Sequence, residues 1–177
     1  MAGGEGVVMS EAMKVEPWLR GTLNHVDSVR RQVLHALELS NEDAERWCGD
    51  LSDEEVNARP YGVASVAFHL RHIARSLDRL LTYAEGNQLT DEQMAALRGE
   101  LDPGARAEEC LEEFRMGIGS AARRVAELLP GDFEEGRGVG RKGLPSTVGG
   151  LLVHCAEHTQ RHSGQMVTTA KVVAGMR

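Results

Sequence analysis

Apolar residues recur at three- and four-residue steps along four long stretches of the chain, which is the spacing of a helix with one buried face. These stretches are residues 17–38, 65–85, 106–129 and 146–174. Their limits carry residues that favour helix starts and stops, namely Pro17, Ser65, Gly86, Pro130, Pro145, Ser146, Thr147 and Gly175. Shorter helices are predicted at residues 41–48, 52–58 and 90–99.

Four long amphipathic helices predict an all-α fold, a four-helix bundle with short additional helices. No stretch alternates apolar and polar residues with the period of two that marks a half-buried strand. Residues 131–146 are rich in glycine and charge, so we expect one long loop there, of the kind that often carries function. We expect residues 1–14 to form a mobile N-terminal tail and residues 15–177 to form one domain.

The composition narrows the class of protein. The 177 residues suffice for one domain, and no apolar run approaches the roughly 20 residues that a membrane span needs. The formal net charge of −7, with basic residues scattered among acids and only 4% aromatic residues, argues against nucleic-acid binding. The N-terminus lacks the pattern of a secretory signal, and three unpatterned cysteines favour a reducing compartment, so we expect a cytoplasmic protein.

The segment HCAEHTQRHSGQM, residues 154–166, places three of the seven histidines at four-residue steps. At about 100° per residue, His158 and His162 fall in the middle of the apolar stripe of their helix, and His154 falls at its edge. Two imidazoles one turn apart on a buried face are either core histidines with hydrogen-bond partners or two ligands of a metal ion. We favour the metal because both rings share one side of the helix.

A third ligand is expected from a facing helix, where bundle proteins build their sites. The segment FHLRHI in the helix predicted at 65–85 offers His69 and His72. His69 lies about 55° from the centre of the apolar stripe and His72 about 115°, so helical geometry alone favours His69. His25 lies at the edge of the stripe of its own helix, and His35 is expected on the solvated side.

The segments SVAFHLRHIARSLDRLLTYAEG and STVGGLLVHCAEHTQRHSGQM together resemble the DinB/YfiT-like superfamily of four-helix bundles with a three-histidine metal site. That family places one histidine two turns after a capping Ser or Thr, and a His-x-x-x-His before x-Gly-Gln. The resemblance implies His72, His158 and His162 as metal ligands, with Gln165 completing the motif. It covers about residues 16–174 and implies helix connections unlike a simple up-and-down bundle. On this basis His72 is preferred, and His69 stays the alternative third ligand.

Such a site predicts a metal-dependent enzyme, because three neutral imidazoles leave coordination positions open on a divalent ion. The resemblance implies a hydrolase or a transferase that uses a low-molecular-weight thiol, with a small-molecule substrate. Zinc, nickel and iron all suit imidazole ligands. The candidate supporting or alternative ligands are Gln165, His69, His154 and Cys155, although a buried cysteine is more often a small core residue.

The alternative interpretation is a non-catalytic module that binds a small molecule or takes part in a stress response, with a metal or structural histidine cluster. No acid or base in the predicted helices stands out as a proton carrier, which favours this alternative. Asp78 and Arg79 are predicted surface charges. Arg137, Arg141 and Lys142 of the 131–146 loop are candidates for anion contacts, although a solvated loop is the favoured interpretation. We expect a homodimer that forms through an apolar helix face.

Overall fold

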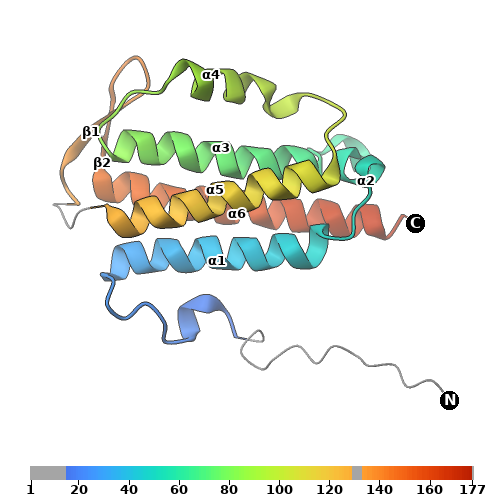
Figure 1. Cartoon of the computed structure of the whole chain (residues 1–177), viewed down its shortest axis with the longest axis horizontal. Helices are drawn as coiled ribbons and strands as arrows, with labels where there is room; N and C mark the ends of the chain where they lie inside the picture. Colours follow the sequence, from blue (N-terminus) through green and yellow to red (C-terminus); the bar gives the residue numbers. More distant parts are fainter. Residues whose placement is uncertain (1–14, 129–132, 177) are drawn as a thin grey trace.

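The computed structural model describes residues 15–128 and 133–176, and most of them are helical (Figure 1). The long helices are α1 (Ser28–Cys48), α3 (Val66–Ala84), α5 (Ala107–Glu127) and α6 (Val148–Ala174). The shorter elements are α2 (Asp53–Asn57), α4 (Asp91–Arg98), the strands β1 (Gly136–Val139) and β2 (Leu144–Thr147), and 3₁₀ turns at Pro17–Leu19, Pro60–Gly62 and Gly99–Leu101. The predicted all-α bundle is confirmed. The predicted tail at 1–14 and the predicted stop at Pro130 lie outside the described residues.

The long helices do not simply run up and down. In Figure 1, α1 and α6 run in one direction and α3 and α5 in the other. Helix α1 packs on α6, α6 packs on α3, and α3 packs on α5. Because α3 and α5 are parallel, the chain must return along the bundle between them, and this return carries α4 along the outside of α3.

Side-chain caps fix the starts of the helices that matter for the site. The Ser65 hydroxyl accepts a hydrogen bond from the backbone N–H of Phe68 at 3.2 Å, and the Thr147 hydroxyl accepts one from Gly150 at 3.0 Å. Each such cap contributes about 1 kcal/mol to the stability of its helix. Ser65 was the predicted cap of α3, and Thr147 was one of two candidates, with Ser146, for the cap of α6.

The prediction for the first helix was wrong. Residues 17–38 and 41–48 were expected to form two helices, but α1 runs without a break from Ser28 to Cys48. The Asp27 carboxylate accepts hydrogen bonds from two backbone amides at the start of α1, which fixes the start there. Upstream, Leu23 has a φ of +58°, which no right-handed helix contains. The helical spacing of apolar residues continues across the turn at Leu23, which is why the sequence predicted a helix that begins before Ser28.

The prediction of one long loop at 131–146 was also wrong. In the described part of this segment, β1 and β2 pair as an antiparallel hairpin with Val139 opposite Leu144. Gly140 and Gly143 take φ values of +69° and +58° at the turn, a conformation that glycine adopts without strain. The strands are four residues each and contain glycine and proline, so they are too short to show a strand period.

The hairpin is anchored on the bundle by Arg137, which was predicted to be solvated. Its side chain is only 16% exposed, and its Nε donates a 2.8 Å hydrogen bond to the carbonyl oxygen of Ala84 at the end of α3. The anchor holds the hairpin next to the C-terminal end of α3. The turn of the hairpin therefore lies beside α3 and α4, and residues of all three line one cavity.

The main apolar core fills the space between the long helices, with Leu37, Leu70, Phe114 and Leu152 among its fully buried members. A second, small cluster contains Tyr83, Ala84 and Leu151. Helices α3 and α5 are in close contact at Gly117, where an added Cβ would meet the Cβ of Ala74 at 2.5 Å. Among the described residues, none of the helices combines the length and the apolar character that crossing a bilayer requires.

Candidate metal centre

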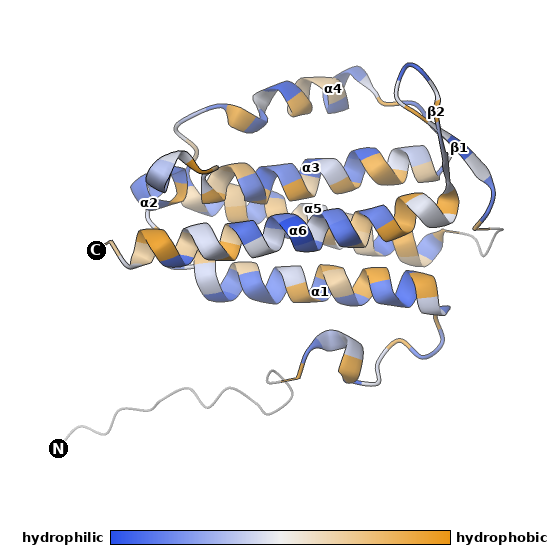
Figure 2. Ribbon diagram, turned by 180° about the vertical axis from the view of Figure 1, so that it is seen from behind, coloured by the Kyte–Doolittle hydropathy of each residue, from blue (hydrophilic) through white to orange (hydrophobic). Residues whose placement is uncertain are grey.

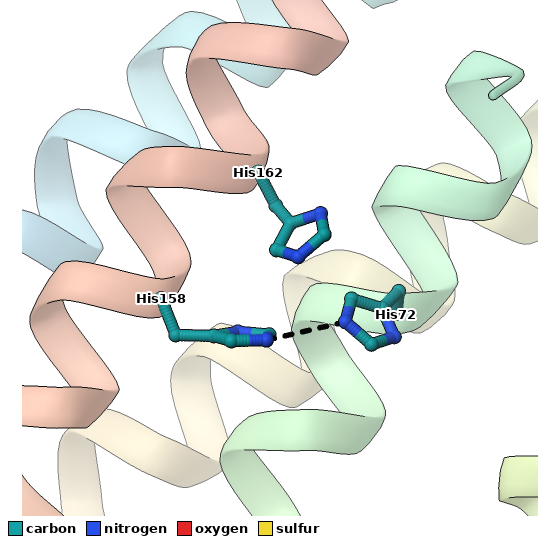
Figure 3. A group of neighbouring side chains, drawn as sticks. All are labelled: His72, His158 and His162. Atoms are coloured by element: carbon teal, nitrogen blue, oxygen red, sulfur yellow. Dashed lines mark hydrogen bonds between the residues drawn. The ribbon is translucent and has the colours of Figure 1, made fainter. Parts of the chain in front are cut away.

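Three histidines from two helices meet between α3 and α6 (Figure 3). His72 comes from α3, and His158 and His162 come from α6. One nitrogen from each ring lies within 4.8 Å of the others, and the Nε2 atoms of His72 and His158 are 3.2 Å apart. The ring centroid of His162 is 4.4 Å from that of His72 and 4.5 Å from that of His158. All three side chains are half-buried, so the cluster has one face toward solvent.

Local sequence explains why these rings meet. His158 and His162 are one turn apart on α6, whose middle is a hydrophilic band between more hydrophobic ends (Figure 2). His72 lies two turns into α3, whose start is fixed by the Ser65 cap. Phe68, one turn before His72, stacks on the His72 ring with a centroid separation of 5.0 Å and an interplanar angle of 16°. This stacking limits the orientations that the His72 ring can take.

The second nitrogen of His72 is held by a buried carboxylate. Glu100, in the 3₁₀ turn after α4, is 5% exposed, and its Oε2 lies 2.7 Å from His72 Nδ1. Its other oxygen accepts a 2.7 Å hydrogen bond from Arg79, which also donates to Ser76 Oγ at 2.9 Å. An ionised carboxylate only accepts, so His72 carries its proton on Nδ1 and leaves the Nε2 lone pair free toward the cluster.

The ionised state of Glu100 follows from its partners. Burial on its own would raise the pKa of this carboxyl, but the hydrogen bonds from His72 and Arg79 hold the pKa below its usual value. Glu100 is therefore negatively charged at neutral pH and cannot donate to His72.

His162 also has a partner behind it. Its Nδ1 lies 3.1 Å from Nδ1 of His69, which is 3% exposed on α3. One of these nitrogens donates and the other accepts, so each ring constrains the proton position of the other. His162 Nε2 is then the nitrogen available to the cluster when Nδ1 is the donor.

His158 and His162 are neutral at physiological pH. Burial lowers the pKa of His158 and of His162 to about 4, and the neighbouring histidines lower each pKa further. Burial likewise lowers the pKa of His69 to about 4, helped by His162 and His72. Neutral imidazoles have the free lone pair that a metal ion requires.

The structure brings His72 rather than His69 into this group, against the helical-wheel expectation. The helical wheel ranks residues by their angular distance from the apolar stripe, so it selected His69, which is the more buried of the two. The cluster instead lies at the edge of the α3–α6 contact. For the same reason His158 and His162 are half-buried, whereas their neighbours Thr159 and Ser163 are 0% and 1% exposed.

The remaining predicted site residues lie outside the group. His154 has a side chain 43% exposed and bonds Glu157 at 2.9 Å. Cys155 is fully buried, and burial raises the pKa of its thiol to about 12, so it is a core residue as expected. Gln165 is exposed and lines a separate cavity of about 500 Å³ with His69.

Two expectations about charged and polar residues were wrong. His35 was expected in solvent but is 4% exposed, and its Nε2 lies 3.2 Å from the Thr22 hydroxyl. Arg79 was expected on the surface, but its side chain is 12% exposed because it is paired with Glu100. Asp78 is on the surface, where it pairs with Arg124. His25 is exposed.

A cavity of about 800 Å³ opens directly on the cluster. His72 and His158 form part of its floor, α4 forms one wall, and Gly140 and Arg141 of the hairpin turn close one end. The volume is that of a typical small-molecule site. The cluster is therefore accessible to a ligand.

The arrangement of helices and histidines agrees with the comparison to known families. The family model of the DinB superfamily matches residues 23–166. The chain belongs to the DinB superfamily. The match includes α3, the part of α6 that carries the histidines and the return that carries α4. A comparison with curated proteins gives no match.

Sequence reasoning missed Glu100 and the hairpin wall of the cavity. Glu100 is one of several acids near the end of a short predicted helix, and nothing in its local pattern distinguishes it. Its role depends on the path of the chain between α3 and α5.

Proposed function

We propose that this member of the DinB superfamily is a metal-dependent transferase that acts on a low-molecular-weight thiol, with a divalent ion held by His72, His158 and His162. The convergence of three imidazoles, two of which line the cavity, carries the proposal. Nitrogen ligands about 2.0–2.1 Å from a tetrahedral zinc lie about 3.4 Å apart. The 3.2 Å between the Nε2 atoms of His72 and His158 is close to that separation, so the donor set fits such an ion.

The surrounding residues support this assignment because they leave the correct nitrogens free. Glu100 accepts from His72 Nδ1, so His72 would bind through Nε2. His69 can accept from His162 Nδ1 in the same way, and His162 would then also bind through Nε2. Histidine ligands of metal ions usually have such a partner on the second ring nitrogen, which fixes both the tautomer and the ring orientation.

A bound divalent ion supplies Lewis acidity, which lowers the pKa of a thiol or water molecule in an open coordination position. Among the described residues near that position, the candidate proton carriers are His154, Glu100 and Asp91, and His154 Nδ1 is bonded to Glu157. Both oxygens of Glu100 are already hydrogen-bonded. Asp91 is the acid among the described residues that line the cavity, and it is at the far end of α4, about 10 Å or more along the helix from Glu100.

His154 lines the cavity with its ring centroid 5.5 Å from that of His158, but its Nδ1 is bonded to Glu157, and we favour thiol chemistry because a metal-bound thiolate needs no further proton acceptor. Hydrolysis by a metal-bound water usually uses a carboxylate or histidine to carry protons. A thiol loses its proton readily when it binds a metal, and the resulting thiolate is already a strong nucleophile. The cavity would hold an electrophilic small molecule against that sulfur.

The first test is the metal content of protein purified without a histidine tag, measured by elemental mass spectrometry. We expect about one metal ion per chain in the wild type and loss of the metal in His158→Ala. His154→Ala is the matched control, because His154 is one turn earlier on α6 and is outside the group. Equal loss in both variants, or no uptake of zinc, nickel or iron by metal-free protein, would overturn the proposed site.

The second test separates the two reactions. Metal-loaded protein is assayed with a panel of small thiols and a fluorogenic alkyl chloride, and separately with a panel of esters and amides. We expect metal-dependent conjugation of a thiol that His158→Ala abolishes. Metal-dependent ester or amide cleavage without conjugation would contradict the transferase and indicate a hydrolase. Metal binding without either activity would indicate a binding module.

A further inference from the structure

The cavity above the histidine cluster is elongated along α3. Its floor includes His72, Ser76 and Tyr83 of one helix, and His72 and Tyr83 are eleven residues apart. At the helical rise per residue, this floor is about 16 Å long. His72 and His158 are at one end, and Tyr83 and the hairpin turn are at the other. A ligand that reacts at the cluster and fills the cavity is therefore an extended molecule.

The middle of the cavity is apolar. Leu80 of α3, Leu89 before α4 and Met94 of α4 line it, and Tyr83 adds an aromatic ring toward the hairpin end. Burial of a chain of methylene groups against such walls contributes about 0.8 kcal/mol for each fully buried CH₂. These walls favour a ligand with an apolar body between its two ends.

The far end of the cavity carries a free cation. Arg141 lies in the hairpin turn and lines the cavity, and it has no hydrogen bond or ion pair among the described residues. Arg79 is not available in the same way, because Glu100 and Ser76 occupy its donors. The anchor of Arg137 on Ala84 holds the hairpin, and so holds Arg141, against the end of α3.

From these observations we infer that the natural ligand is an extended amphipathic acid, with its reactive group at the cluster, an apolar body along α3 and an oxyanion bound by Arg141. This inference rests on the proposed function for the reactive end. A guanidinium binds a carboxylate, sulfonate or phosphate through paired N–H donors. Asp91 also lines the cavity, and its negative charge opposes binding of an anion there, so removal of that charge should strengthen binding.

The experiment uses cobalt-loaded protein and a series of ω-mercaptoalkanoates of increasing chain length. Each acid is paired with the ω-mercaptoalkanol and the ω-mercaptoalkanesulfonate of the same length. Binding of the sulfur is followed by the sulfur-to-cobalt charge-transfer band. We expect the acids to bind more tightly than the alcohols only at the long end of the series. The sulfonates distinguish a requirement for a carboxylate from a requirement for any oxyanion.

The variants locate the anion site. Arg141→Gln should weaken the best acid about fivefold to tenfold and leave its alcohol unchanged, a range that allows for the exposure of Arg141. Asp91→Asn should strengthen binding of the same acid. Lys142→Gln is the matched control, because Lys142 is the next residue in the same turn and is not among the residues lining the cavity. A preference for short acids that is lost in Arg98→Gln would place the anion at the other end and overturn the assignment of Arg141.

A metal-free measurement separates this inference from the proposed function. Decanoate is added to metal-free protein, and the Nε–Hε signal of Arg141 is followed by NMR. A shift of this signal that saturates supports the anion site, even if no charge-transfer band forms with any thiol. The absence of a shift, or equal binding of acids and alcohols to cobalt-loaded protein, would overturn the anion site and leave the metal centre intact.

Discussion

Replacing Glu100 by glutamine tests whether the buried carboxylate controls the metal ligand. Glutamine has the same shape but has one acceptor oxygen and one donor NH₂ group. Arg79 has only donors, so the amide oxygen must face Arg79 and the NH₂ group must face His72 Nδ1. His72 Nδ1 then becomes an acceptor, and the proton moves to Nε2, which is the nitrogen that faces His158. The substitution therefore blocks the atom proposed to bind the metal.

The size of the effect follows from the lost contact. A hydrogen bond to a charged group contributes about 1.5–3 kcal/mol. Loss of the outer partner of a histidine ligand typically lowers metal affinity about 10- to 100-fold, which corresponds to about 1.4–2.7 kcal/mol. The two ranges agree, so we expect Glu100→Gln to bind zinc at least tenfold more weakly than the wild type.

The assay is a competition titration of metal-free protein against a chromophoric zinc chelator, with the free energy of unfolding measured on the same samples. Glu113→Gln is the matched control, because Glu113 also pairs with an arginine of α3, at 2.5 Å from Arg75 Nε, and does not contact a histidine. Both variants lose an ion pair, but only Glu100→Gln should lose metal affinity. Long-range ¹⁵N NMR of the metal-free protein should show the proton of His72 on Nδ1 in the wild type and on Nε2 in Glu100→Gln.

The reasoning is refuted if Glu100→Gln binds zinc as tightly as the wild type, or if Glu113→Gln loses as much affinity. An unchanged His72 tautomer in Glu100→Gln would contradict the proton assignment even if affinity falls. In that case the loss would come from general destabilisation and not from the ligand nitrogen.

Two further predictions concern stability. Gly117→Ala should lower the free energy of unfolding by about 1–3 kcal/mol, because the new Cβ would lie 2.5 Å from the Cβ of Ala74. Gly119→Ala, two residues along α5 with no atom within 4 Å of the new Cβ, should raise the free energy of unfolding by about 0.5–1 kcal/mol. Urea unfolding of both variants measures these changes, and changes of the same sign would contradict the close helix contact. The metal-free protein should lose stability as pH falls from about 6.5 to about 4, because the pKa of His158 and of His162 is lowered to about 4 and the unfolded chain takes up protons first. Replacing both histidines by glutamine should reduce this dependence of the urea midpoint on pH without abolishing it, because the pKa of His69 is also lowered to about 4, and an unchanged slope would show that other groups cause it.

Helices α3 and α6 could be predicted almost to the residue because two local signals agreed. Apolar spacing marked their bodies, and Ser65 and Thr147 marked their starts. The pair His158 and His162 could be found for the same reason, since a spacing of four residues on a helix brings two rings together whatever the rest of the fold does. Local signals of this kind do not depend on which elements pack against each other.

The choice between His69 and His72 could not be made from the helix alone. A helical wheel ranks residues by their distance from the core, whereas an accessible metal site lies where the core ends. His69 is the more buried of the two and supports His162 from behind, while His72 faces the cavity. The family motif identified His72 because it records the position of the partner helix, which a single helix does not contain.

The chain path explains why the site needs this topology. Because α3 and α5 are parallel, the segment between them must run back along the bundle, and it does so antiparallel to α3: Gln93 bonds Thr82, Ala96 accepts from Arg75, and Glu100 reaches His72. The same segment therefore forms a wall of the cavity and delivers the carboxylate that orients a proposed metal ligand. A bundle with a tight turn between antiparallel helices at this point would have neither. The two histidine-bearing helices supply the nitrogens, and the return between α3 and α5 determines which nitrogen of His72 faces the cluster.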